Sequence, residues 1–94
     1  MNSYELTIVL PGIVTAAKKK TVGEKIEKLV KTIKGSIKNT EDWGEVELSY
    51  KLGKQTTGNF IHFNLELESG SAKSMDQKLK IEDDIIRYLL VRKD

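Results

Sequence analysis

Residues 4–10 alternate between large apolar side chains and smaller or charged ones. A repeat of two residues is typical of a β-strand that buries one face. The pattern stops at Pro11-Gly12, a pair that marks a loop. We therefore predict a first strand over residues 4–10. Its core-facing side chains are Tyr4, Leu6, Ile8 and Leu10.

After Val22 the apolar positions follow helical spacing through Ile33. Thr21 and Glu24 are spaced as a capping box, and Gly35 stands where such a helix would stop. The pattern predicts a helix over at least residues 22–34. An earlier start at Thr15 remains open, because alanines 16 and 17 favour a helix whereas lysines 18–20 would lie near its positive end.

Alternation returns in residues 46–52 and again in residues 60–67. We expect residues 36–40 to form the first half of the earlier strand, and a loop over Gly53–Gly58 to join the two strands as an antiparallel hairpin. Trp43 and Gly44 are expected at a bend or bulge. Phe60 and His62 fall on the face opposite the core residues of their strand, where an aromatic side chain can stack on a base or pack under a protein partner.

A second helical pattern runs from Ala72 to Leu79 with Ser71 as its N-cap, and residues 85–92 are rich in strand formers. The order βαββαβ predicts an α+β fold of the ferredoxin-like type, with a four-stranded antiparallel sheet and both helices on one face. We expect residues 1–94 to form a single domain of this kind. The predicted core consists of Ile8, Ile26, Val30, Ile33, Leu48, Phe63, Leu65, Met75 and Leu79.

Composition limits the possible functions of the 94 residues. The chain has no cysteine, and its longest apolar stretch is far shorter than the ~20 residues of a membrane span. No basic leader of the secretory type opens the sequence. The net charge of +2 divides unevenly: residues 1–40 have eight lysines and three glutamates (+5), and residues 41–94 have eight basic and eleven acidic side chains (−3). We expect a cytoplasmic protein with a basic side and an acidic side, and without a membrane partner.

Catalytic chemistry has little support in the sequence. The single histidine, His62, has no nucleophile beside it and cannot form a multi-histidine metal site. Acylphosphatases share the predicted strand order, but the loop Pro11–Thr15 lacks the arginine that they use. We expect no enzyme activity, no cofactor, no metal and no small-molecule substrate.

Three stretches together resemble the bacterial small-subunit ribosomal protein S6 family. They are Tyr4-Glu5 followed by Ile8-Val9-Leu10 and Pro11; Trp43-Gly44 followed by Leu48, Tyr50, Lys54 and Gly58-Asn59-Phe60; and Leu79-Lys80-Ile81 followed by Asp83, Asp84-Ile85-Ile86 and Arg87-Tyr88-Leu89. The resemblance implies a structural, ribosome-associated protein that binds the central domain of the small-subunit rRNA together with ribosomal protein S18. An RNA-recognition-like module and a ligand-sensing regulatory module of the same fold remain alternatives.

The chain departs from this family after Trp43-Gly44, where Glu45, Val46 and Glu47 replace a usual run of basic residues, and at Lys51, which replaces a proline. RNA contact is therefore expected from basic residues outside this strand. The candidates are Lys18, Lys19, Lys20, Lys54, Arg87 and Arg92. Glu45 and Glu47 lie on a predicted edge strand, where they either pair with a basic protein partner or prevent edge-to-edge aggregation.

Overall fold

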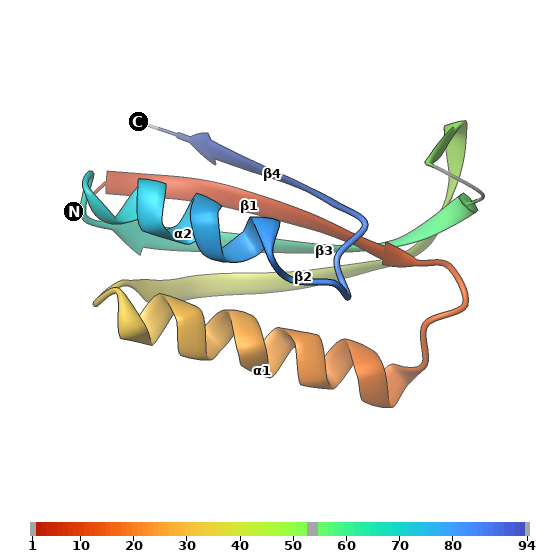
Figure 1. The fold of residues 1–94 in the computed structure, drawn as a ribbon, viewed down its shortest axis with the longest axis horizontal. Helices are drawn as coiled ribbons and strands as arrows, with labels where there is room; N and C mark the ends of the chain where they lie inside the picture. The colour runs from red at the N-terminus through yellow and green to blue at the C-terminus, as the bar shows by residue number, and fades with distance from the viewer. Residues whose placement is uncertain (1, 53–54, 94) are drawn as a thin grey trace.

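The computed structural model describes residues 2–52 and 55–93, without the side chains of residues 48–52 and 55–56. Two helices and four strands follow one another in the predicted order (Figure 1). They are β1 (Asn2–Pro11), α1 (Ala16–Thr32), β2 (Ser36–Leu52), β3 (Gln55–Leu67), α2 (Ser71–Lys80) and β4 (Arg87–Arg92). The ferredoxin-like fold class is confirmed.

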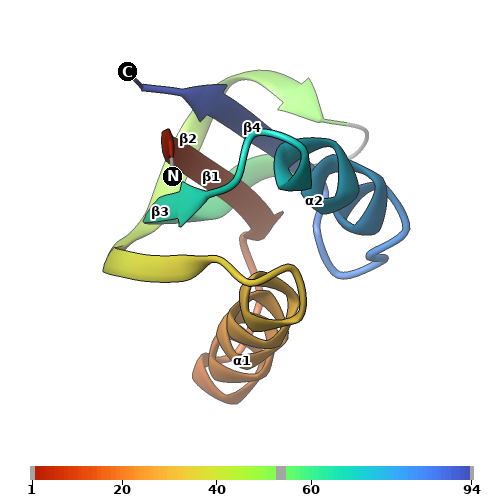
Figure 2. The ribbon, with the colours of Figure 1, turned by 90° about the vertical axis from the view of Figure 1, so that its left-hand side faces the viewer.

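The four strands form one antiparallel sheet in the order β2-β3-β1-β4. In its centre, Ile8 of β1 is opposite Ile61 of β3 on one side and Tyr88 of β4 on the other. Strands β2 and β4 are the edges, as predicted for β2. Both helices lie on the same side of the sheet, which leaves the other face without a helix (Figure 2).

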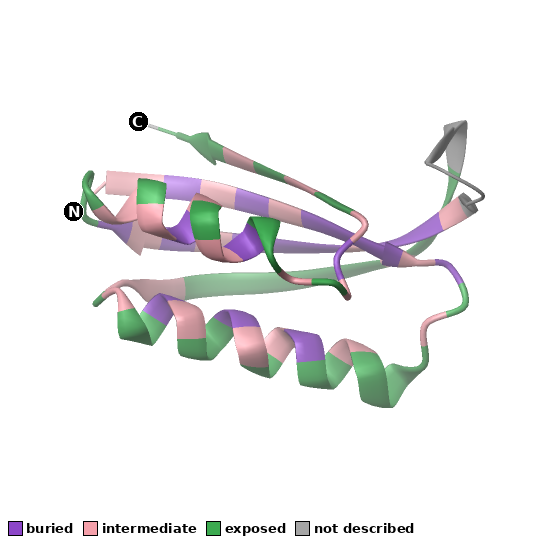
Figure 3. Cartoon of the chain, in the orientation of Figure 1, coloured by how far each residue is buried: buried purple, intermediate pink, exposed green. Residues whose placement is uncertain are grey.

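The core lies between the sheet and the helices, and the inward sides of both helices are buried (Figure 3). Seven of the nine predicted core residues are in it: Ile8, Ile26, Val30, Phe63, Leu65, Met75 and Leu79. Ile33 is only partly buried and packs against this cluster, because it caps the end of α1. The side chain of Leu48 lies outside the described residues.

Of the two helix starts that the sequence left open, the structure has the earlier one, after Thr15, and the capping box of Thr21 and Glu24 is wrong. Helix α1 begins at Ala16, and the Thr15 hydroxyl accepts a hydrogen bond from the Lys18 N–H at 3.1 Å. Thr21 lies inside the helix, where its hydroxyl donates to the Ala17 carbonyl. The earlier start places three lysines in the first helical turns, near the positive end of the helix.

Helix α1 ends two residues earlier than predicted and is followed by a tight turn. Lys34 has the left-handed backbone conformation, with φ of 62°, and the Gly35 N–H donates to the Val30 carbonyl at 2.8 Å. Glycine is needed at position 35 for space rather than for its φ angle. A Cβ atom there would lie 2.8 Å from the Glu66 carbonyl oxygen and would overlap the Leu67 side chain.

The β2–β3 hairpin is longer than the alternation predicted. Strand β3 begins at Gln55, so the expected loop over Gly53–Gly58 is wrong for residues 55–58, which are strand. The register places Gly58 opposite Pro11, and residues 55–57 therefore extend past the end of β1 (Figure 1). The predicted bulge is confirmed: the register shifts between Asp42 and Gly44, and Gly44 has φ of 74°.

Two boundaries near α2 also differ from the prediction. Gly70 is the N-cap, and Ser71 is the first helical residue, with its hydroxyl donating to the Ile33 carbonyl at 3.2 Å. The last strand begins at Arg87 rather than at residue 85. Ile85 is apolar because it packs into the core, and Ile86 joins the sheet only through its N–H, which donates to the Val9 carbonyl at 2.9 Å.

Candidate functional site

Neither helix covers the sheet face opposite them (Figure 2), and we call it the open face. Alternation along each strand assigns its residues, because their neighbours form the core. It is formed by Glu5, Thr7 and Val9 of β1, Phe60, His62 and Asn64 of β3, Trp43 and Val46 of β2, and Arg87, Leu89 and Val91 of β4.

Several large apolar side chains of the open face are exposed. Leu89 is 63% exposed, Trp43 51%, Val91 46% and Val46 40%. Trp43 and Val46 lie on the edge strand β2, and Leu89 and Val91 lie on the opposite edge strand β4, so the exposed apolar side chains form two pairs at the two edges of this face.

The centre of the open face holds a stacked aromatic pair. The rings of Trp43 and His62 are nearly parallel, at 9°, with their centres 4.9 Å apart. His62 Nδ1 lies 2.9 Å from the Thr7 hydroxyl, and Nε2 lies 3.4 Å from the Glu5 carboxylate. The indole N–H of Trp43 donates to Glu41 at 3.4 Å. His62 is thereby buried, and Trp43 is the aromatic side chain that reaches solvent.

The stack of Trp43 on His62 leaves less ring surface for base stacking by Phe60 and His62 than the sequence suggests. Phe60 and His62 do lie on the open face, as predicted, but Phe60 is half-buried and Trp43 covers one side of His62. A base-stacking platform made of these two residues has little free ring surface. Sequence reasoning did not identify Trp43 as part of the face, because the bulge at Gly44 turns it toward a residue 19 positions away.

The outer edge of the sheet is acidic where β2 passes the bulge. Glu45 and Glu47 are exposed, opposite Asn59 and Thr57 of β3. Glu45 lies next to the loop that follows β1, since its carboxylate is 3.2 Å from the position of a Cβ on Gly12. The edge prediction is therefore geometrically possible, and both carboxylates are accessible.

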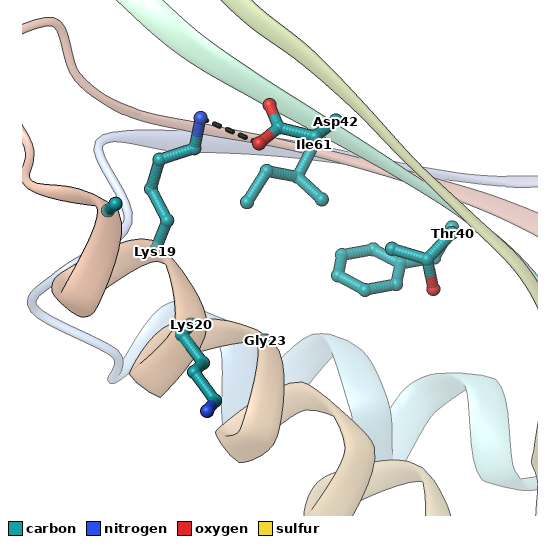
Figure 4. Close-up of a pocket in the computed structure, with 8 residues that line it drawn as sticks. Lys19, Lys20, Gly23, Thr40, Asp42 and Ile61 are labelled. Atoms are coloured by element: carbon teal, nitrogen blue, oxygen red, sulfur yellow. Dashed lines mark ion pairs between the residues drawn. The ribbon is translucent and has the colours of Figure 1, made fainter.

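Lys19, one of the predicted RNA-binding residues, joins three elements of the fold. Its ammonium lies 2.7 Å from the Asp42 carboxylate of β2 and donates to the Asn59 amide oxygen of β3 at 3.2 Å. Figure 4 shows the side chain reaching from α1 across to Asp42. The pKa of Asp42 is lowered, chiefly by the hydrogen bond from Lys19. Only 19% of the Lys19 side chain is exposed, which limits its contact with RNA.

Lys18 belongs to a second charge cluster, between α1 and the segment that follows α2. Asp84 lies 3.0 Å from Lys18 and 3.1 Å from Lys25, and Lys25 also contacts Glu82 at 3.2 Å. The two lysines lower the pKa of Asp84, Lys18 most strongly. The pKa of Lys25 is raised, first by its hydrogen bond to Asp84 and then by Glu82. The side chains of Lys18 and Lys25 are nonetheless almost half exposed.

The remaining RNA candidates are dispersed. Lys20 is exposed and lines a groove of about 310 Å³ between α1 and the β2–β3 pair, where it points away from Asp42 (Figure 4). Arg87 and Arg92 are exposed at opposite ends of β4, and alternation puts only Arg87 on the open face. Lys54 lies outside the described residues. The described candidates are thus spread over α1 and β4 and do not form one compact patch.

Within residues 2–52 and 55–93, no group of three or more histidine or acidic side chains is arranged to hold a metal ion. Among the helices described, none is both long and apolar enough to cross a membrane.

The described residues form a ferredoxin-like protein with an uncovered sheet face, an acidic edge and a lysine-rich helix. Residues 3–92 match the sequence profile of the family described as Ribosomal protein S6. The chain belongs to the ribosomal protein S6 family, whose members are structural proteins of the small ribosomal subunit in the bacterial cytoplasm.

Individual relatives agree with this assignment. The small ribosomal subunit protein bS6 of Alkaliphilus metalliredigens is 29% identical over 92 residues, which cover 98% of this chain and 97% of that protein. The protein of the same name from Pelagibacter ubique is 33% identical over 92 residues, which cover 98% of this chain and 76% of that protein. The fold resembles the crystal structure of 30S ribosomal protein S6 from Thermotoga maritima, with a TM-score of 0.90 and 18% sequence identity. The match covers 98% of this chain and 87% of that chain.

Proposed function

We propose that this chain binds the central domain of the small-subunit rRNA together with ribosomal protein S18, with the open face for the protein and, apart from Arg87 on that same face, basic residues elsewhere for the RNA. The observation that carries the proposal is the open face, where Trp43, Leu89 and Val91 are exposed and no helix covers them. The lysine-rich start of α1 lies on the other side of the sheet. A protein and an RNA can therefore be bound at the same time.

The open face and its edge are suited to a basic protein with an apolar surface. The four exposed apolar side chains supply area that becomes buried on docking. Glu45 and Glu47 flank Val46 on the edge strand, where alternation turns their side chains to the helix side. As exposed charges at the edge, they can still orient a basic partner and speed encounter more than they raise affinity.

The RNA surface is expected to be electrostatic. Lysine and arginine that reach phosphates release counterions, so affinity falls steeply with salt and depends little on sequence. Lys20 is the best placed of the described candidates, because it is exposed and forms no ion pair with any residue that the structure describes. Lys18 is half exposed and can exchange Asp84 for a phosphate.

The RNA proposal is tested by neutralising all six candidates, Lys18, Lys19, Lys20, Lys54, Arg87 and Arg92, and measuring binding to a central-domain rRNA fragment against salt. Each true contact should reduce the log-log slope by about 0.9 for a duplex or about 0.7 for a single strand. The control neutralises six other lysines: Lys28, Lys31, Lys34, Lys73, Lys78 and Lys80. Equal slopes in the two variants would rule out the proposed surface.

The protein half is tested by placing one charge on the open face. Leu89→Asp should weaken binding to ribosomal protein S18 while leaving the thermal unfolding temperature almost unchanged, since the side chain is 63% exposed. Ile81→Asp is the matched control, because Ile81 is 79% exposed but follows α2 and lies off this face. If Leu89→Asp and Ile81→Asp bind the partner equally well, the open face is not the docking surface.

A further inference from the structure

The only histidine and the only tryptophan of the chain are stacked on each other in the middle of the open face. Histidine is the side chain whose charge changes near neutral pH, and the exposed tryptophan is part of the surface proposed above for the protein partner. The pair therefore joins the only imidazole of the chain directly to a docking side chain.

The hydrogen bonds around His62 accept both protonation states without movement of the ring. In the neutral form with hydrogen on Nε2, this N–H faces Glu5 Oε2 at 3.4 Å, and Nδ1 accepts from the Thr7 hydroxyl at 2.9 Å. When Nδ1 takes up a proton, it becomes the donor, and the hydroxyl of Thr7 rotates to accept. Protonation thus adds a charge in place rather than expelling the side chain.

The charged groups facing His62 come from each neighbouring strand. Strand β1 supplies Glu5, which is shared with Lys93 at 3.6 Å just after β4. Strand β2 supplies Glu41, the register partner of His62, which is held by the indole of Trp43. Strand β4 contributes Arg87 farther along the same face, opposite Val9. Both helices lie on the other side of the sheet (Figure 2).

Protonation has two physical consequences for the surface. An imidazolium ring attracts the electron-rich face of an indole, so the stack with Trp43 becomes tighter. The open face also gains one positive charge beside Glu5 and Glu41, which offsets part of the negative charge that attracts a basic partner.

We propose that His62 holds the indole of Trp43 in place, and that protonation of His62 makes docking of a basic protein at the open face slower as pH falls. The docking half of this proposal rests on the proposed function. The support half concerns the isolated chain and stands on the stacking and hydrogen bonds alone.

The isolated full chain tests the support half, because its single tryptophan reports directly on its single histidine. A protonated imidazole in contact with an indole quenches its fluorescence by accepting an electron. Trp43 emission should fall as pH is lowered, and the fall should depend on His62, the only imidazole of the chain. The imidazole proton resonances should shift with the same midpoint. His62→Gln keeps a planar polar group and should remove the transition, and an equal transition in that variant would overturn the proposal.

The docking half is tested by measuring association of the chain with ribosomal protein S18 at low ionic strength, at about pH 7.5 and about pH 5.5. Comparison with His62→Gln cancels the partner's own titration. The rate constant should fall at the lower pH more for the original chain than for the variant. An equal pH dependence in both would overturn the docking half while leaving the proposed function intact. Absence of binding at either pH would overturn the proposed function as well, and the fluorescence result would still decide the support half.

Discussion

The ammonium of Lys19 lies 2.7 Å from the carboxylate of Asp42, and this ion pair joins the start of α1 to the edge strand β2. Three lysines in the first turns of α1 lie near the positive end of the helix, where cations are unfavourable. Carboxylates from other elements offset this effect: Asp42 for Lys19, and Asp84 for Lys18. The two ion pairs explain why the helix starts before the lysines rather than after them.

Replacing Lys19 and Lys20 separately should distinguish a structural lysine from an RNA-binding one. Lys19→Met removes hydrogen bonds to Asp42 and Asn59, so we expect a loss of about 1 to 2 kcal/mol in the free energy of unfolding. Lys20→Met should change stability by less than about 0.5 kcal/mol, because the side chain is exposed. Urea unfolding of both variants measures the difference.

The same two variants should reverse their order in RNA binding. Lys20→Met should reduce the salt slope, whereas Lys19→Met should leave it nearly unchanged once the protein is folded. Equal effects of the two substitutions on stability and on the salt slope would show that the ion pair with Asp42 does not distinguish them.

Lys34 and Gly35 are adjacent residues in the turn between α1 and β2, and their substitutions should have different effects on stability. Gly35→Ala should be strongly destabilising, because the new methyl would lie 2.8 Å from the Glu66 carbonyl oxygen and overlap Leu67. Lys34→Gly should be neutral to stabilising by up to about 1 kcal/mol, since it relieves a left-handed backbone at a non-glycine residue and costs some chain entropy. The thermal unfolding temperature should fall for Gly35→Ala and stay level or rise for Lys34→Gly, and a fall in both variants would contradict this account.

The fold was largely predictable because the hydrophobic pattern indicates which side of each strand is buried. Residues 4–10 and 60–67 alternate cleanly, and both are strands in the centre of the sheet. The boundaries were less predictable, because Thr15 and Thr21 both precede helix-forming residues and only tertiary contacts select between them. Ile85 fits a strand pattern, yet it is apolar for a different reason, its place in the core.

The candidate site was predictable only in part. Alternation correctly placed Phe60 and His62 on the face opposite the core. It carries no information on which carboxylate each lysine meets, since Lys19 and Asp42 are 23 positions apart and meet only in the folded chain. The contact of Trp43 with His62 likewise depends on the bulge in β2.

Three aspartates should make the protein acid-sensitive. The pKa of Asp42, Asp76 and Asp84 is lowered by hydrogen bonds from Lys19, Tyr88 and Lys18 respectively. A carboxyl group with a depressed folded-state pKa stabilises the fold above its unfolded value of about 3.9, and this stabilisation is lost as pH falls through the folded value. Thermal unfolding temperature should therefore drop below about pH 4.

Asp84→Asn tests this assignment at the most connected carboxylate. The variant should be less stable than the original chain at neutral pH and should lose less stability between about pH 4 and pH 2. Asp83→Asn is the control, because Asp83 is exposed and forms no ion pair with the residues described. Parallel pH profiles for Asp84→Asn and the original chain would exclude Asp84 as a source of the acid sensitivity.

Tyr88 should make the stability of the protein fall at alkaline pH. Its hydroxyl donates to the Asp76 carboxylate at 2.6 Å, and this hydrogen bond raises the pKa of Tyr88 to about 12. A group with a raised folded-state pKa contributes its full stability below its unfolded value, about 10 for tyrosine, and loses it as pH rises through the folded value. Tyr88→Phe should cost about 1 kcal/mol at neutral pH and flatten the decline above about pH 10. An unchanged slope in Tyr88→Phe would assign the decline to other groups.

Glu45 and Glu47 provide a test of whether the acidic edge serves docking or protection. Strand β2 is an edge whose unpaired backbone groups need cover, and charged side chains there hinder pairing with another copy. If they also attract a basic partner, replacing both with lysine should slow association with ribosomal protein S18, most at low salt, because complementary charge acts mainly on the association rate. The fold should be unaffected, since both side chains are exposed.

The two explanations for the acidic edge differ in what the charge-reversed chain does on its own. Lysine at positions 45 and 47 protects an edge as well as glutamate does, so sedimentation should show an unaltered oligomeric state under either explanation. Replacing both glutamates with glutamine removes the charge altogether. Under the protection account the glutamine variant should self-associate and the lysine variant should not, with equal association rates toward the partner for the lysine and original chains. Under the docking account the association rate should fall in the order glutamate, glutamine, lysine, and the differences should vanish at high salt as the charges are screened.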